Sequence, residues 1–459
     1  MKTSLRWPPS RFAVIILAIA LAGLLLRVVF IFTIAPSSVS GDAYYYHHGA
    51  NLLANGEGYI DPYRYNFGNK DNVTLANGEV VEVITPVGHS EPTAGHPPVY
   101  VTYLAAFSFI GLDSVRAHQL ASAVLGAGSI ILAGYLGRYW RNKNIGYIAA
   151  ILTAVYANIW INDGLVLSET AAIFFAFLTS LVGLHFWRNP TRANAAWLGF
   201  VAAFAALSRA ELVLFLPIVV IVVMWRSSLS WKERFIRTAI AGLIGLLTVA
   251  PWIIRNNIAL EEFVTLSDGS GTVLVQANCY ETYYGEKIGF WHLECGNPMP
   301  YGPNGELLDE SQRDVIVRER AMEYISGNTQ RLVTVVVPAR IARMWGVYAP
   351  IWQIRTDIVE GRPGFAAWLG FWQYVVLAPA AIAGAVITWR RKQPVLVIGL
   401  WAVLATFTAA TAFGITRYRT AAEVSVVMFA AITIEALWQW WKRREANETV
   451  TAEAVTTSS

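Results

Sequence analysis

The apolar run FAVIILAIALAGLLLRVVFIFTI, residues 12–34, ends just before the polar stretch SGDAYYYHHGANLLANGEG, residues 40–58. The apolar run is long enough to cross a bilayer as a helix, which takes about 20 residues. In the polar stretch, Ser40 is a good N-cap and Asp42 falls in the first turn, where the helix dipole favours an anion. Asn55-Gly56 then provides a stop signal. This junction therefore predicts a membrane helix followed at once by a surface helix. Aromatic residues at such a place are typical of a membrane interface and have no need of a catalytic role.

The composition defines the class of protein. Of 459 residues, 55% are hydrophobic and only 14% are charged, and the mean hydropathy is +0.44. These values are typical of a polytopic membrane protein. The first apolar run is too long for a signal peptide and no small-residue cleavage site follows it, so we expect it to stay as an anchor. We predict an all-α membrane protein with about ten transmembrane helices, near residues 12–34, 115–137, 145–163, 169–187, 194–208, 211–225, 236–254, 365–389, 394–413 and 418–441.

The basic residues predict the orientation of the chain. Every second connection is rich in lysine and arginine and almost free of acids, which makes these connections cytoplasmic by the positive-inside rule. Both termini are then inside, and the net charge of +4 reflects topology and not nucleic-acid binding. The short apolar segment 97–112 would break the alternation if it crossed the membrane. We therefore expect it to be a juxtamembrane or re-entrant helix on the outer side.

Two long polar segments, residues 35–114 and 255–364, both fall outside under this scheme. We accordingly divide the chain into a membrane module (1–254), a large outer loop (255–364), C-terminal membrane helices (365–444) and a tail expected to be disordered (445–459). Both cysteines lie in the large outer loop, and their spacing predicts a Cys279–Cys295 disulfide that contributes about 3 kcal/mol. A metal site with His292 is the alternative, but no second histidine or CxxC spacing supports it.

Polar residues at the outer ends of the predicted spans require an explanation, because they are costly at membrane depth. Arginine suits a phosphate, since its planar fork makes bidentate, charge-assisted hydrogen bonds. An acid such as Asp42 would take a proton from an attacking hydroxyl while the arginines stabilise a leaving phosphate. For several residues a structural role is the alternative: a snorkelling side chain for Arg27, a helix cap for Glu169 and a hairpin pair for Arg209 with Glu211. The outer clusters comprise Arg27, Glu169, Arg209, Glu211, Arg255, Arg417, Tyr418, Arg419 and Glu423.

Six segments in order also resemble a known family. They are GDAYYYHHGANLLANGEGY, EPTAGHPPVYVTYLAAFSFIGLDSVRAHQLASAVLGA, VLSET, GFVAAFAALSRAELVLFLP, APWIIRNN and TRYRTAAEVSVVMFAA. Taken together the chain resembles the bacterial polyprenyl-phosphate-sugar-dependent glycosyltransferases of the GT-C superfamily, which include protein O-mannosyltransferases and the lipid A aminoarabinose transferase. The resemblance implies a GT-C-type fold with two large extracytoplasmic loops.

The resemblance also implies roles for individual residues. Asp42 matches the catalytic base of the first outer loop and Glu169 matches the acid of the second. The chain departs from many relatives at Gly41-Asp42, where they carry two acids, and at His96, where they carry lysine or arginine. With Arg209 added from the outer clusters, the expected donor-phosphate ligands are His96, Arg209, Arg255, Arg417, Tyr418 and Arg419. The expected substrate contacts are Tyr45, Tyr46 and His47, although aromatic residues here also suit the headgroup region.

We therefore predict a hexosyl- or pentosyltransferase in the plasma membrane. It would move one monosaccharide from polyprenyl phosphate to a hydroxyl of a cell-envelope glycan or lipid, by a single displacement on the extracytoplasmic face. Its partners would be the donor lipid, a glycan, lipid or protein acceptor, and membrane lipids, but no nucleic acid. No cofactor is expected, and the departure at Gly41 weakens the case for a divalent metal without deciding it. A protein O-mannosyltransferase is one alternative, and a flippase or transporter is another, which the dissimilar halves and one-sided polar residues disfavour.

Overall fold

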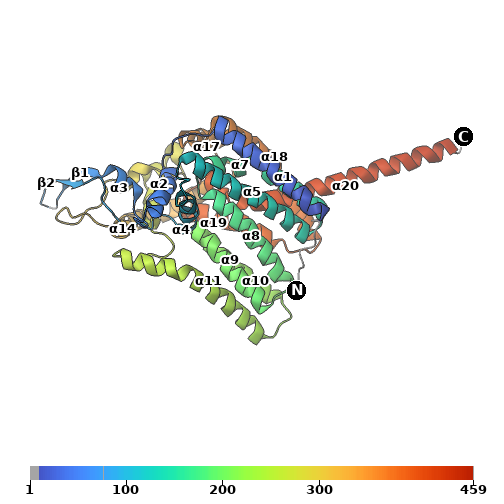
Figure 1. The fold of residues 1–459 in the computed structure, drawn as a ribbon, viewed down its shortest axis with the longest axis horizontal. Coiled ribbons are helices and arrows are strands. Elements are labelled where there is room, and N and C mark those ends of the chain that lie inside the picture. The colour runs from blue at the N-terminus through green and yellow to red at the C-terminus, as the bar shows by residue number, and fades with distance from the viewer. Residues whose placement is uncertain (1–9, 76, 458–459) are drawn as a thin grey trace.

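The computed structural model describes residues 10–75 and 77–457. Long helices lie side by side in a bundle (Figure 1), and the hairpin β1–β2 gathers with α2, α3 and α14 at one end of it. Helix α20 extends from the opposite end. Segments of both polar regions thus lie at the same end of the bundle, as their predicted common side requires.

Six helices of the described chain are long and apolar enough to cross a membrane, and a seventh span is possible if a bent pair counts as one. The bent pair joins α6 (Lys143–Val155) to α7 (Ala157–Trp160) and η1 (Ile161–Gly164) at 59°. The remaining expected spans are helical but short. They are α9 (Arg192–Ser208), η2 (Ala210–Leu214) with α10 (Phe215–Arg226), and α19 (Leu396–Thr411). The six long helices are α1 (Arg11–Thr33), α5 (Val115–Trp140), α8 (Glu169–Arg188), α11 (Trp231–Ala259), α18 (Gly364–Arg390) and α20 (Ala422–Thr457), whose candidate span lies within Ala422–Glu448.

The short spans end at polar residues. Helix α9 stops at Ser208 because Arg209 has an extended backbone and directs its guanidinium to carboxylates. Helix α6 stops at Val155, and the chain after it carries Asp163, whose carboxylate is buried against Arg27 with Nε to Oδ2 at 2.5 Å. The ends of α6 and α9 therefore coincide with polar side chains that have charged partners at the polar end of the bundle, as well as with the ends of apolar sequence.

The first polar region folds into α2 (Asp42–Ala54), α3 (Pro62–Phe67), β1 (Asn69–Thr74), β2 (Val80–Thr85) and α4 (Pro98–Ser108). Strands β1 and β2 pair antiparallel, with Asn69 opposite Thr85. This small hairpin is added to the predicted all-α fold, and the Asn77-Gly78 dipeptide before alternating valines is its sequence signal. Helix α4 has 11 residues, about 16 Å at 1.5 Å per residue, which is too short to span.

The second polar region contains nine short elements in order. Its helix α14 is the longest, and α12 packs against it. The elements are α12 (Ser270–Ala277), α13 (Tyr280–Tyr283), η3 (Gly285–Lys287), η4 (Leu293–Gly296), α14 (Glu310–Gly327), α15 (Thr329–Arg331), η5 (Leu332–Val336), α16 (Val337–Met344) and α17 (Pro350–Val359).

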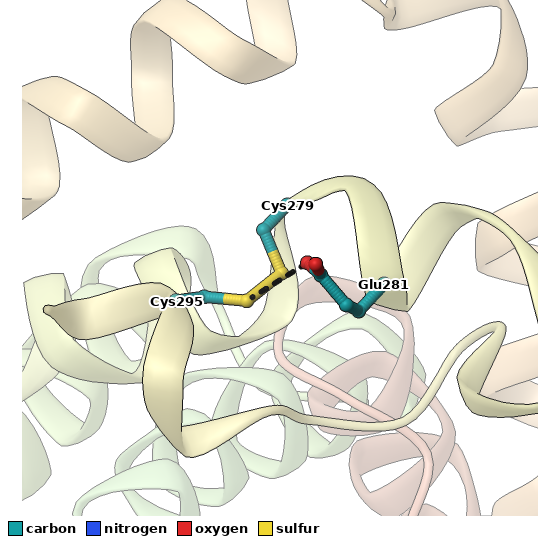
Figure 2. A group of neighbouring side chains, drawn as sticks. All are labelled: Cys279, Glu281 and Cys295. Carbon is teal, nitrogen blue, oxygen red and sulfur yellow. Dashed lines mark hydrogen bonds between the residues drawn. A yellow bond between two sulfur atoms is a disulfide. The ribbon is translucent and has the colours of Figure 1, made fainter.

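The predicted disulfide joins Cys279 at the start of α13 to Cys295 in η4 (Figure 2), which confirms the pairing. Glu281 lies beside the bond, with its carboxylate 3.5 Å from Cys295 Sγ. Because the two sulfurs are bonded to each other, neither offers a thiolate to a metal. His292, the other residue of the metal alternative, instead lies with Nδ1 2.7 Å from Lys287 Nζ.

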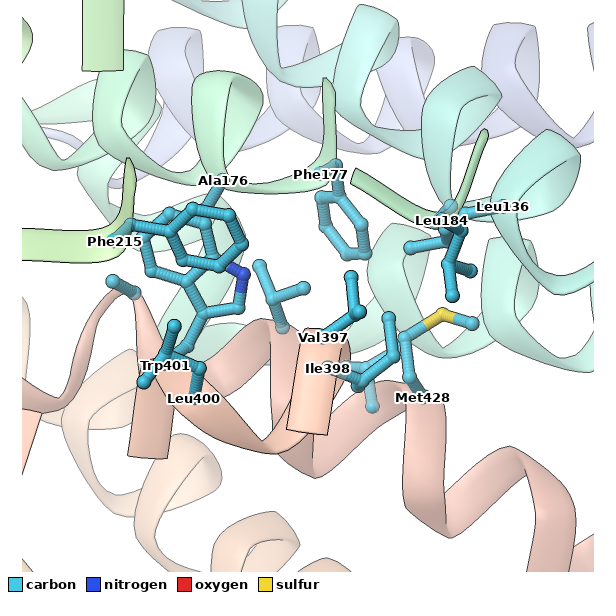
Figure 3. Close-up of a cluster of buried hydrophobic side chains, with 14 of the residues drawn as sticks. Leu136, Ala176, Phe177, Leu184, Phe215, Val397, Ile398, Leu400, Trp401 and Met428 are labelled. Carbon is cyan, nitrogen blue, oxygen red and sulfur yellow. The ribbon is translucent and has the colours of Figure 1, made fainter. Parts of the chain in front are cut away.

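An apolar core ties the C-terminal helices to the N-terminal module (Figure 3). The rings of Phe215 on α10 and Trp401 on α19 stack with centroids 4.1 Å apart. The Trp401 indole N–H donates to Ser180 Oγ on α8 at 2.7 Å, so its one polar atom is satisfied inside the core. This packing holds the segment between α19 and α20 against the start of α8.

Helix α20 continues through Thr457, so the disorder expected for residues 445–459 is not found in the described part of the tail. Its alanines and glutamates favour helix, and Arg444 pairs with Glu448 one turn later at 2.8 Å. Residues 458–459 lie outside the described residues.

Candidate active site

The candidate catalytic acids and two arginines meet at the polar end of the bundle. Asp42 is the first residue of α2, Glu169 is the first residue of α8, and Arg417 lies in η6 (Thr416–Arg419) between α19 and α20. Arg209 joins them from the turn between α9 and η2. The N-cap of α2 is Gly41, not Ser40 as expected, because the chain turns there at φ +53°, a conformation that glycine adopts without strain.

Arg417 bridges the two acids. Its Nε contacts Glu169 Oε1 at 2.7 Å, and its terminal NH2 contacts Asp42 Oδ2 at 2.7 Å. Arg209 contacts the same Glu169 oxygen at 2.9 Å and Glu211 Oε1 at 2.6 Å. Acids and arginines thus alternate through four separate segments of the chain. Glu169 makes ion pairs with side chains, which is more than the helix-capping role weighed for it.

Asp42 is the exposed member of this cluster. Its side chain is 37% exposed, whereas that of Glu169 is fully buried. Burial alone would raise the pKa of the Asp42 carboxyl, but the charges of Arg417 and His96 and the hydrogen bond from Arg417 outweigh it and hold the pKa well below its usual range. Asp42 is therefore an ionised carboxylate that a reactant can reach.

His96 lies next to Asp42, with Nε2 3.8 Å from Oδ1. Burial lowers its pKa, and the nearby Asp42 opposes this only in part. The rings of Tyr45 and Tyr46 flank the imidazole, with centroids 4.7 and 4.9 Å away. Tyr46 is in turn fixed by its hydroxyl, which donates to Ser168 Oγ at 2.9 Å. The stretch around residues 42–46 therefore faces the candidate site.

A cavity of about 270 Å³ opens beside the two arginines. Arg209, Arg417 and Tyr418 line it together with Glu211. Its other walls combine two threonines, Thr408 and Thr420, with apolar residues: Leu212 from η2, Leu404 and Ala405 from α19, and Ala421 just before α20. A cationic end joined to an apolar wall suits a ligand with an anionic head and a hydrocarbon tail.

Three predicted site residues have other partners. The Arg255 guanidinium donates to the carbonyl oxygens of Thr93 at 2.7 Å and Tyr59 at 2.6 Å. Arg419 forms a buried ion pair with Glu423 at 2.7 Å. His47 is buried, with Nδ1 2.9 Å from Nδ1 of a histidine on α5. The structure therefore does not bring these three side chains into the Asp42–Arg417 cluster.

Two acidic features were missed from the sequence. Asp163 is the partner of Arg27 and also accepts from Thr170 Oγ1 at 2.7 Å, which gives Arg27 the structural role weighed for it. An acid inside a predicted span was the available signal. Asp268 and Glu310 lie together where the two polar regions meet, and Glu310 accepts from Thr93 Oγ1 at 2.8 Å. Nothing local in the sequence marks that pair.

Residues 95–254 match the family model described as dolichyl-phosphate-mannose-protein mannosyltransferase. Among solved structures, the chain is similar to the Archaeoglobus fulgidus oligosaccharyltransferase in complex with zinc and sulfate. The identity is 14% and the TM-score 0.53 over 96% of this chain and 51% of that one. The same enzyme, AglB, in complex with an inhibitory peptide and a dolichol-phosphate matches at 14% identity and TM-score 0.53, over 97% and 52%. The chain thus spans about half the length of these structures.

ArnT from Cupriavidus metallidurans bound to undecaprenyl phosphate is less similar, with 15% identity and a TM-score of 0.38 over 92% of this chain and 77% of that one. No curated protein matches the chain. Residues 95–254 are thus similar to this mannosyltransferase family, and the chain as a whole shares the fold of the archaeal oligosaccharyltransferase.

Proposed function

We propose that this protein transfers a monosaccharide from a polyprenyl-phosphate donor to a hydroxyl of a cell-envelope glycan or lipid on the extracytoplasmic face of the membrane. The observation that carries the proposal is the position of Arg417, which holds Asp42 and Glu169 at once and also lines the 270 Å³ cavity. A solved structure of AglB is a complex with an inhibitory peptide and a dolichol-phosphate. A lipid phosphate suits this cavity by its charge and by its apolar wall.

The cluster is arranged for an exchange of partners. A donor phosphate placed against Arg209 and Arg417 competes with Asp42 and Glu169 for the same guanidinium groups, and bidentate arginine–phosphate hydrogen bonds are strong. Asp42 is the partner that is easily displaced, because it is partly exposed while Glu169 is buried. Once Arg417 turns to the phosphate, the Asp42 carboxylate loses its main electrostatic stabilisation and becomes a stronger base.

The reaction then follows from this geometry. The acceptor oxygen attacks the anomeric carbon while the bond from that carbon to the phosphate oxygen breaks. The hydroxyl proton goes to Asp42, and the bonding electrons leave with the phosphate. Arg209 and Arg417 stabilise the added negative charge on the polyprenyl phosphate. A single displacement of this kind inverts the configuration at the anomeric carbon.

Transfer to a protein hydroxyl is the second candidate. The matched mannosyltransferase segment, residues 95–254, contains three members of the site: His96, Glu169 and Arg209. It leaves out Asp42 and Arg417, which act on the acceptor and the donor in the proposed reaction. The match therefore favours mannose as a sugar to test and a peptide as an acceptor to test.

Native mass spectrometry of the purified protein tests the donor. We expect a bound polyprenyl phosphate or its sugar adduct in the wild type, and loss of that lipid in Arg417→Ala. The same preparation is then supplied with the identified donor and with either envelope glycans or a serine- and threonine-rich peptide. Transfer to the peptide alone would favour the second candidate. Absence of any lipid phosphate, together with no binding of added polyprenyl phosphate, would contradict both.

A further inference from the structure

A second and larger cavity, of about 530 Å³, lies on the other side of the segment that carries Arg417. Thr416, Arg419 and Thr420 line this cavity, and Thr420 also lines the 270 Å³ cavity. The stretch from residue 416 to 420 is therefore the wall between the two spaces. Arg417 itself belongs to this wall, so a group attached to a phosphate at Arg417 starts beside it.

The larger cavity is built differently from the smaller one. Its lining includes two aromatic rings, Phe371 and Tyr374 on α18, and amide and carboxylate groups of Gln353 and Asp357 on α17. Arg362 adds a cation from the turn before α18. Aromatic faces combined with side chains that donate and accept hydrogen bonds suit a polyhydroxylated ring.

Gln353 is an unusual member of this lining. Its side chain is only 1% exposed, and its Nε2 donates to Asp357 Oδ1 at 3.1 Å. Because a carboxylate only accepts, this contact fixes the amide orientation and leaves Oε1 as the free end. That oxygen is buried without a hydrogen-bond donor from any described residue. An unsatisfied buried acceptor is costly and rare, so it indicates a ligand group that donates to it.

Arg362 presents the complementary chemistry. It is 8% exposed, and its guanidinium makes no ion pair or hydrogen bond with the described part of the chain. Asp357, by contrast, already accepts from Thr416 Oγ1 at 2.9 Å, which ties α17 to the wall that carries Arg417. The cavity lining thus offers one free hydrogen-bond acceptor, Gln353 Oε1, and one cationic donor, the Arg362 guanidinium.

We propose that this cavity binds the sugar of the lipid-linked donor, with Gln353 accepting from a hydroxyl, Arg362 donating to another, and Phe371 and Tyr374 packing against the ring. The inference rests on the proposed function and adds the residues that select the sugar. A sugar of the acceptor has the same chemistry, but only the donor sugar is joined to a phosphate at Arg417. The cavity is therefore assigned to the donor.

The test compares the affinity of the full-length protein for polyprenyl phosphate without a sugar and for the same lipid carrying mannose, glucose or arabinose. In the wild type we expect one sugar lipid to bind at least about 10-fold more tightly than the bare lipid. Gln353→Leu and Arg362→Ala should each reduce the affinity for that sugar lipid about 5- to 10-fold, the loss of one hydrogen bond. Binding of the bare lipid should not change, which also shows that the variants are folded. Gln330→Leu, at an exposed position of α15, is the matched control.

Each other outcome overturns the assignment. If Gln353→Leu and Arg362→Ala bind the sugar lipid as the wild type does, the sugar lies elsewhere. Equal losses for both lipids would show that these residues act through the fold or the phosphate site. If both variants retain the donor affinity but raise the acceptor KM, the cavity holds the acceptor. If the wild-type protein binds no lipid phosphate at all, the proposed function is contradicted as well. In that case Arg417→Ala and the wild type show the same absence of lipid binding.

Discussion

Asp42→Asn separates the chemistry of the site from its binding. Asparagine keeps the size of the side chain and most of its hydrogen bonding but takes no proton. If Asp42 is the base, transfer should fall by roughly 100-fold or more. Donor binding should respond in the opposite direction, because the substitution removes a carboxylate that holds Arg417 at 2.7 Å in the absence of donor. The variant should therefore bind the donor as tightly as the wild type or more tightly.

The size of that second effect follows from exposure. Asp42 is 37% exposed and Arg417 18% exposed, so their ion pair is worth about 1 kcal/mol or less. Donor affinity should then rise by no more than about 5-fold. The fold should survive, since Glu169 still contacts Arg417 at 2.7 Å from a fully buried position. A 100-fold loss in rate would therefore not come from a loss of stability.

The assay measures transfer rate and donor affinity on the same preparation, with thermal unfolding as a check on the fold. Asp113→Asn, the same change at an exposed residue between α4 and α5, is the control. Near-normal transfer by a folded Asp42→Asn protein would refute the catalytic role and return residues 40–58 to an interfacial helix. A large fall in donor affinity would refute the partner exchange instead. Because the pKa of Asp42 is held below its usual range in the donor-free protein, kcat/KM for the donor should not fall through protonation of this base down to mildly acidic pH.

Three further predictions concern the arginines, the topology and the outer acids. Arg417→Ala should weaken donor binding about 10- to 100-fold, because a hydrogen bond to a charged group contributes ~1.5–3 kcal/mol. Arg255→Ala should lower the unfolding temperature and leave donor affinity unchanged, because Arg255 binds backbone carbonyls. Equal effects of the two changes on donor affinity would contradict this division. A reporter fused after Arg141 should be cytoplasmic and one near Gly302 extracytoplasmic, and finding both on one side would break the topology. Burial raises the pKa of Asp268 to about 6. Between about pH 4 and 6 the folded state therefore binds more protons than the unfolded state. The free energy of unfolding should then fall as the pH rises through that window. Asp268→Asn should flatten this slope in thermal unfolding, and an unchanged slope would show that other groups cause it.

The parts of the site that were predictable share a physical property. Asp42, Glu169, Arg209 and Arg417 are charged residues at the ends of apolar runs, and the positive-inside rule places all of those ends on one side. Burial of charge beside a membrane demands partners, so convergence was the expected outcome. The disulfide followed from a similar restriction, since the large outer loop contains both cysteines.

What escaped prediction depends on how distant segments pack. Arg255 and Arg417 look equivalent in the sequence, yet one faces the backbone carbonyls of residues 59 and 93 and the other faces two carboxylates. Similarly, Arg419 is two residues from Arg417, and a 3₁₀ turn directs it to Glu423 and the opposite cavity. A short tight turn thus assigns two neighbouring arginines to two different spaces. If those spaces hold the phosphate and the sugar of one donor, substitutions in α17 and α18 can alter the choice of sugar without changing Asp42 or Arg417. The reason is that the residues lining the two cavities share only the wall formed by residues 416–420.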